Sequence, residues 1–144
     1  MLYTLTLYLH ILSAIIATGP LFGIFPLLNR MQKAPDDQLQ SYVIAIQGVL
    51  RAVANGGHVL VPTGLLLIWF GGWSFSSFWI LATIVIMLCS LLFMARAFKP
   101  SMAFAQSDEF TKIRFIKMVK TATYQYILLM GILLWLMVDK PMLW

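Results

Sequence analysis

The chain has 144 residues, of which 61% are hydrophobic and only 10% are charged. This composition excludes a soluble globular enzyme and predicts an integral membrane protein. The net charge of +5 is not a nucleic-acid signal, because the basic residues gather at the ends of apolar segments and no recognition motif accompanies them. We expect these cations to meet the anionic head groups of the lipid bilayer instead.

Four apolar segments are long enough to cross a hydrocarbon layer of ~30 Å, which takes roughly 20 helical residues. They run from Leu2 to Leu28, from Ala52 to Phe70, from Phe78 to Phe98 and from Thr121 to Val138. The first segment has no basic n-region and no small-residue cleavage site, so we interpret it as a retained helix. The sequence therefore predicts an all-α fold, a single domain over residues 1–144 built as a four-transmembrane-helix bundle.

Two of the connections predict extensions of these helices. The turn residues Pro35-Asp36-Asp37 predict a helix that begins near Gln38 and runs on into the second span. Between residues 107 and 120, Lys112, Lys117 and Lys120 alternate with apolar residues. That basic amphipathic pattern predicts the start of the fourth helix at the level of the lipid head groups.

The distribution of positive charge predicts how the chain is oriented. Nine of the ten Lys and Arg residues flank the first and third connections, and the second connection carries no charge. Cytoplasmic connections carry the excess of Lys and Arg in membrane proteins. We therefore expect the first and third connections in the cytoplasm and both termini outside.

The chain contains two histidines, His10 and His58, and each lies inside an apolar segment. An imidazole in hydrocarbon needs a partner, so these positions are candidates for function. The helical neighbours of His10 include Ser13 and Ala17, which are small enough to let another helix or a flat ligand approach closely. Further along, Pro20 removes one helical hydrogen bond, and we expect a kink that opens space between helices.

The second span carries a polar face. Gln47, Arg51, Asn55 and His58 are spaced by four, four and three residues, which places them on one side of a helix. Polar residues aligned in a span are expected to face the bundle interior rather than lipid. Because Gly56-Gly57 carry no side chains, they leave room for a bulky group beside His58.

These residues lead us to predict a cofactor site. His10, Arg51, Asn55 and His58 are the predicted cofactor-binding residues, and His10 and His58 the predicted metal ligands. Neutral imidazole is a common ligand of haem iron, and the CxxCH attachment motif is absent, so the predicted cofactor is non-covalent haem b. Arg51 would pair with a porphyrin propionate or a quinol oxygen. A structural role, with both imidazoles bonded to backbone carbonyls or to each other, stays open.

Depth within the bilayer limits a shared site. Counted from the outer helix ends at ~1.5 Å per residue, His10 and His58 differ in depth by roughly 6 to 9 Å. One histidine paired with a methionine is the alternative, and Met87 and Met130 lie near the depth of His10. The single cysteine, Cys89, is interpreted as a small apolar core residue.

Three stretches of the chain carry a family resemblance. They are LHILSAIIATGPLFGIFPLLNR near the N-terminus, Arg51 followed by VPTGLLLIWFG, and the terminal LMVDKP. Together they resemble a bacterial predicted integral-membrane family of unknown function. That family is similar to the HemJ-type protoporphyrinogen oxidases and to the CopD-type copper-resistance membrane proteins.

The resemblance implies roles for particular residues. In HemJ-like proteins the first-helix histidine is associated with haem, which maps to His10, while an arginine entering the second helix maps to Arg51 and the final lysine to Lys140. This chain differs from the HemJ pattern at Gly19-Pro20 and at His58. The resemblance also implies a multi-pass location in a bacterial inner membrane.

Three functions therefore compete at this point. The first is a haem b protein with a redox role, either electron transfer or HemJ-like porphyrinogen oxidation, with quinone or porphyrin as the small-molecule partner. The second is a copper-handling membrane protein of CopD type, in which histidines and methionines are the ligands. The third is a non-catalytic subunit of a larger membrane complex or homo-oligomer, in which the histidines are structural.

Overall fold

The computed structural model describes residues 1–107 and 111–141. Within this part of the chain the secondary structure is entirely helical. The elements are α1 (Leu2–Lys33), the short 3₁₀ turn η1 (Asp36–Gln38), α2 (Leu39–Phe70), α3 (Phe78–Phe104) and α4 (Lys112–Asp139). The predicted all-helical class with four membrane-spanning helices is confirmed, because all four helices are long and apolar enough to cross a bilayer.

The helices are longer than the apolar spans. As the turn at Pro35 predicts, α2 begins at Leu39 and continues without a break through the second span. The fourth helix begins at Lys112, within the basic stretch from which its start was predicted, whereas residues 108–110 lie outside the described residues. The first helix is a single helix that continues through Pro26 and through Pro20, the position at which the kink is predicted.

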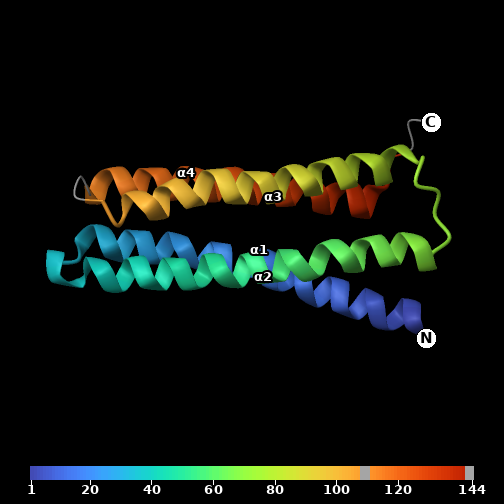
Figure 1. Ribbon diagram of the computed structural model, residues 1–144, viewed down its shortest axis with the longest axis horizontal. Helices are drawn as coiled ribbons and strands as arrows, with labels where there is room; N and C mark the ends of the chain where they lie inside the picture. The colour runs from blue at the N-terminus through green and yellow to red at the C-terminus, as the bar shows by residue number, and fades with distance from the viewer. Residues whose placement is uncertain (108–110, 142–144) are drawn as a thin grey trace.

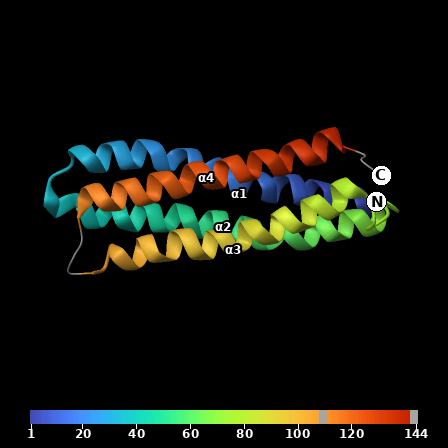
Figure 2. The same cartoon turned by 90° about the horizontal axis from the view of Figure 1, so that it is seen from above.

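The four helices form two antiparallel hairpins. Figure 1 shows α1 and α2 in one layer and α3 and α4 in the other, and Figure 2 shows that α4 lies beside α1 and α3 beside α2. The packing is uneven: α1 packs along α2 and α3 packs along α4, while α2 and α3 touch at few points. The interface between α2 and α3 is therefore the loosest of these four helix pairs.

The two ends of the bundle differ. The N-terminus and the end of α4 lie together at one end, which we call the termini end (Figure 1). At the opposite end, the basic end, Lys112 Nζ donates to the Ala34 carbonyl at 2.8 Å and lies 3.7 Å from an Asp36 carboxylate oxygen. These contacts tie the start of α4 to the connection between α1 and α2.

The tightest packing lies away from the termini end. Fully buried side chains cluster in the second half of α1, the first half of α2 and the first half of α4: Leu21, Ile24, Met31, Ile46, Val53, Phe115 and Val119. Outward-facing positions carry large apolar side chains such as Leu12, Leu92 and Leu128. A surface of this kind is expected where helices face lipid rather than water.

A glycine brings α1 and α2 close together. A Cβ atom added to Gly56 would lie 2.7 Å from the backbone nitrogen of Ala17. Only glycine therefore allows the two backbones to approach as they do, in the manner of small residues at membrane helix crossings. This crossing sets the rotation of α2, and with it the direction in which the polar residues of α2 point.

Candidate functional site

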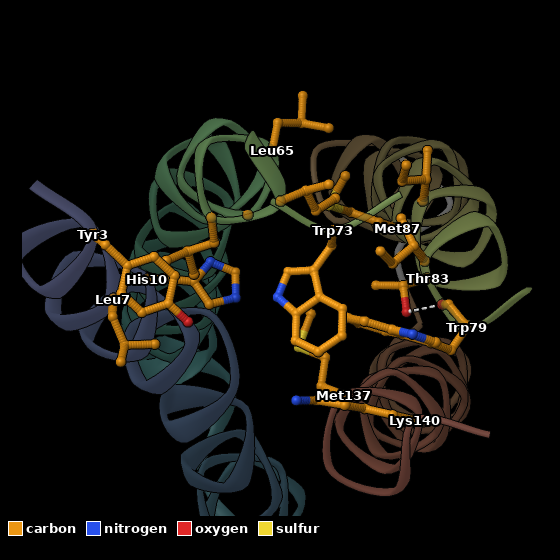
Figure 3. Close-up of a pocket in the computed structure, with 15 residues that line it drawn as sticks. Tyr3, Leu7, His10, Leu65, Trp73, Trp79, Thr83, Met87, Met137 and Lys140 are labelled. Atoms are coloured by element: carbon orange, nitrogen blue, oxygen red, sulfur yellow. Dashed lines mark hydrogen bonds between the residues drawn. The ribbon is translucent and has the colours of Figure 1, made fainter. Parts of the chain in front are cut away.

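A cavity of about 240 Å³ lies at the termini end of the bundle. It is lined by residues of all four helices and by Trp73 from the connection between α2 and α3. In Figure 3 the His10 ring enters from α1, and the indole of Trp73 lies on the other side of the space. We call this space the termini cavity. Its polar and polarisable lining groups are Tyr3, His10, Trp73, Trp79, Thr83, Met87, Met137 and Lys140.

One turn of α2 holds the His10 ring. His10 Nδ1 lies 3.1 Å from the hydroxyl oxygen of Thr63. The Thr63 hydroxyl directs its own proton to the backbone carbonyls of Val59 and Leu60, at 2.8 and 3.0 Å. With that proton engaged, the Thr63 oxygen is the acceptor, so we assign the imidazole proton to Nδ1.

This assignment leaves the second nitrogen of the ring with a lone pair. Among the hydrogen bonds of residues 1–107 and 111–141, none involves His10 Nε2. A fixed imidazole with Nδ1–H bonded to an oxygen and Nε2 free is the arrangement that proteins use to present histidine to a metal.

Gly64 leaves the space that the His10 ring occupies against α2. A Cβ atom at this position would lie 3.1 Å from His10 Cε1 and 3.6 Å from Nδ1. Any larger side chain would push against the imidazole, so Gly64 lets the ring lie against α2 while Thr63 fixes its rotation. Neither residue was a candidate in the sequence, although both belong to the VPTG stretch that carries part of the family resemblance.

Aromatic and cationic groups form the far side of the cavity. The rings of Trp73 and Trp79 meet edge to face, with centroids 5.5 Å apart. Lys140 Nζ lies 4.9 Å from the centroid of Trp73 and 5.7 Å from that of Trp79, within the range of cation–π attraction. Lys140 takes a left-handed backbone conformation at the end of α4, with φ of 46°. The resemblance named His10 and Lys140, and the structure brings both to this cavity.

The Thr83 hydroxyl and the Trp79 indole N–H are two hydrogen-bond donors among the residues that line the termini cavity. The Thr83 hydroxyl donates to the Trp79 carbonyl at 2.7 Å, as the dashed line in Figure 3 indicates. The indole N–H of Trp79 is buried and has no hydrogen-bond partner within the described residues. A buried donor without a partner is uncommon in proteins and marks a place where a ligand atom would be stabilised.

The polar face of α2 does not join this cavity. Arg51, Asn55 and His58 are all exposed on the outer surface of the bundle, whereas Gly56 and Gly57 are buried. The expectation that this face turns inward therefore differs from the structure. The reason is the close crossing of Gly56 with α1, which turns the glycines inward and the polar residues away from the core.

The depths along α2 separate the predicted site residues further. His10 is level with Thr63, which follows His58 by five residues, or ~7.5 Å of helix. Arg51 lies twelve residues before Thr63, ~18 Å away along the helix. Arg51 is therefore nearer the basic end than His10 is, and it does not line the termini cavity.

The two methionines considered as alternative partners of a single histidine, Met87 and Met130, line different cavities. Met87 lines the termini cavity together with His10, whereas Met130 lines a second, apolar cavity between α1 and α4. Met137 also faces the termini cavity. Among the described residues there is no group of three or more His, Cys, Asp or Glu side chains that could hold a metal ion, and Cys89 is exposed on α3 rather than in the core.

Comparison with known proteins does not identify a family for this chain. No protein-family model, no curated protein and no solved structure matches the chain. The candidate site therefore stands on its own geometry, with His10 at its centre.

Proposed function

We propose that the termini cavity binds haem b non-covalently, with His10 as an axial ligand through Nε2, and that the protein has a redox role in the membrane. The observation that most supports this proposal is that residues of α2 fix the position and rotation of the His10 ring. Thr63 bonds to Nδ1, Gly64 makes room for the ring, and Nε2 is left free to ligate. Bound haem would supply one-electron transfer, with a quinone or a porphyrin as the partner in the same membrane.

The donor set of the cavity suits this group. His10 offers an imidazole nitrogen, and Met87 and Met137 offer thioethers, the combination found in b- and c-type cytochromes with mixed ligation. Lys140 and the unpaired N–H of Trp79 are donors that can pair with carboxylates such as propionates. The remaining lining is largely apolar, as cofactor pockets are.

The termini cavity must enlarge before it can hold a porphyrin. At about 240 Å³ the cavity is slightly smaller than the ~300 to 1,000 Å³ of ordinary ligand pockets. Trp73, which comes from the connection between α2 and α3, lies opposite His10 (Figure 3). A porphyrin would have to displace the Trp73 side chain, so haem binding is expected to change the fluorescence of this tryptophan.

A copper-handling role of CopD type is the second candidate. It is favoured by the meeting of one imidazole, from His10, with two thioethers, from Met87 and Met137, at the same cavity. Imidazole and thioether ligands suit Cu(I). This candidate needs no displacement of Trp73, because a single ion is far smaller than the cavity.

An absorption experiment on purified protein distinguishes these candidates. The chain is expressed with ample haem supply, purified in mild detergent and recorded before and after dithionite reduction, alongside His10→Ala and the matched control His58→Ala. Haem binding predicts a Soret band that His10→Ala loses and His58→Ala keeps. Colourless protein without stoichiometric iron would overturn the haem proposal, and stoichiometric copper in that protein would support the second candidate.

A loss of the band in both variants would mean that His58 also takes part. Because His58 is exposed on the outer face of α2, that result would point to haem held between two copies of the chain rather than inside one bundle. Size measurement of the purified protein in detergent would then show a dimer that dissociates in His58→Ala.

A further inference from the structure

A second candidate binding site lies between α2 and α3, nearer the basic end. It is a groove of about 320 Å³ that we call the basic groove. Two cations, Arg51 and Lys99, and two amides, Gln47 and Gln106, line it. Its apolar floor includes Leu50 and Phe98, which are 7% and 3% exposed.

Neither Arg51 nor Lys99 has an ion-pair or hydrogen-bond partner among the residues that the structure describes. The ion pair formed among residues 1–107 and 111–141 joins Lys112 to Asp36, and no hydrogen bond of these residues involves the Arg51 or Lys99 side chain. Two positive charges that line the same groove repel each other when nothing lies between them. An anion bound in the groove would remove that repulsion and accept hydrogen bonds from both.

The depth of the groove matches a lipid head group. Arg51 lies nineteen residues before the end of α2 at Phe70, or ~28 Å of helix. Lys99 lies twenty-one residues after the start of α3 at Phe78, or ~32 Å. Since the hydrocarbon layer is ~30 Å thick, both cations reach the membrane surface at the basic end when the other helix ends lie at the opposite surface.

The loose packing of α2 against α3 leaves space for an acyl chain. These helices belong to different hairpins and are joined only at the termini end by residues 71–77 (Figure 1). Ala54 on α2 and Met94 on α3 continue the groove towards the middle of the membrane. A ligand that fits has a negative head at the level of the cations and an apolar tail beside these side chains.

We propose that the basic groove binds an anionic phospholipid, with Arg51 and Lys99 on the phosphate oxygens. Basic pockets between transmembrane helices at the cytoplasmic surface bind anionic head groups in this way. Arg51 offers a planar pair of donors and Lys99 a mobile point charge, while Gln47 and Gln106 have amide donors for the rest of the head group. This site is separate from the termini cavity and does not depend on haem.

The test compares two double variants that lose the same charge. Arg51→Gln/Lys99→Gln removes the cations of the groove, and the control Arg30→Gln/Lys33→Gln removes two exposed cations from the last turn of α1 at the same end. Delipidated protein in detergent is titrated with short-chain phosphatidylglycerol or phosphatidylcholine, and binding is followed by native mass spectrometry. A third titration uses inorganic phosphate alone.

The proposal predicts that phosphatidylglycerol binds the unmodified protein and the control, and that Arg51→Gln/Lys99→Gln weakens binding roughly thirtyfold, from the loss of two cation–lipid contacts. Equal binding by the two double variants would overturn it, and so would tighter binding of inorganic phosphate than of the lipid. Should the groove variant fail to fold, Ala54→Leu keeps both charges while filling the groove. Undiminished lipid binding by Ala54→Leu would also overturn the proposal.

Discussion

Replacing Gly56 with alanine tests the helix crossing that orients α2. The new Cβ would lie 2.7 Å from the nitrogen of Ala17 and 3.0 Å from both the Ala17 Cα and the Ile16 carbonyl carbon. Favourable contacts begin at ~3.5 Å, so the closest approach is short by roughly 0.8 Å. All three atoms belong to the backbone, so α1 as a whole must move away from α2.

The neighbouring Gly57 provides a matched control. A Cβ there would meet only Leu91 Cδ2, at 3.9 Å, which is an ordinary contact. Both substitutions gain the same helix propensity, so it cancels in the comparison. What remains is the cost of overpacking at Gly56, about 1 to 3 kcal/mol of unfolding free energy.

The comparison is measured by unfolding both variants in mixed micelles of mild detergent and sodium dodecyl sulfate. Far-ultraviolet circular dichroism follows the loss of helix, and tryptophan fluorescence follows the packing of the termini cavity. Gly56→Ala should unfold at a lower dodecyl sulfate fraction than Gly57→Ala. If Gly56→Ala is as stable as Gly57→Ala, the close crossing of α1 and α2 is refuted, and with it the reason for the outward direction of His58.

Two further substitutions test the hold on His10. Thr63→Val keeps the shape of the side chain but removes the acceptor for Nδ1–H, so haem affinity should fall roughly 10- to 100-fold. Thr83→Val, which removes another hydroxyl that lines the termini cavity and donates to its own helix, should have little effect, and equal loss in both variants would contradict the role of Thr63. Gly64→Ala places a methyl group 3.1 Å from His10 Cε1 and should shift the Soret band or lower haem content. Gly131→Ala, where a Cβ would have open space, should bind haem as the unmodified protein does, and a matching loss there would mean that the effect is not local.

The membrane-spanning helices could be predicted because hydropathy and length act locally. A segment of ~20 apolar residues must form its backbone hydrogen bonds within itself in lipid, whatever its neighbours are. The early start of α2 was predictable for a similar reason, since Pro35 and the two aspartates after it favour a turn that leads into a helix.

The direction of the polar face of α2 could not be predicted from periodicity. Spacing shows that Arg51, Asn55 and His58 share one side of a helix, but it does not show which side meets α1. Either the polar residues or the glycines of α2 could face α1. Gly56 faces it in the structure because its missing side chain allows the closest backbone approach. A polar pattern alone would have favoured the opposite rotation.

The partner of His10 was partly predictable. His10 and Thr63 are 53 residues apart, so no local motif links them. Their depths do: His10 follows the start of α1 at Leu2 by eight residues, and Thr63 precedes the end of α2 at Phe70 by seven. Counting from helix ends across an antiparallel pair therefore identifies residues at the same level, although it leaves their rotation about each helix undetermined.

Ligand replacement at His10 tests the central proposal most directly. His10→Gly removes the imidazole and leaves a space that free imidazole can enter, while Thr63 and the remaining lining of the cavity stay in place. We predict that His10→Gly loses the Soret and reduced α bands of the unmodified protein and that added imidazole restores them. A variant that keeps the original bands without imidazole would contradict the assignment of His10 as the haem ligand.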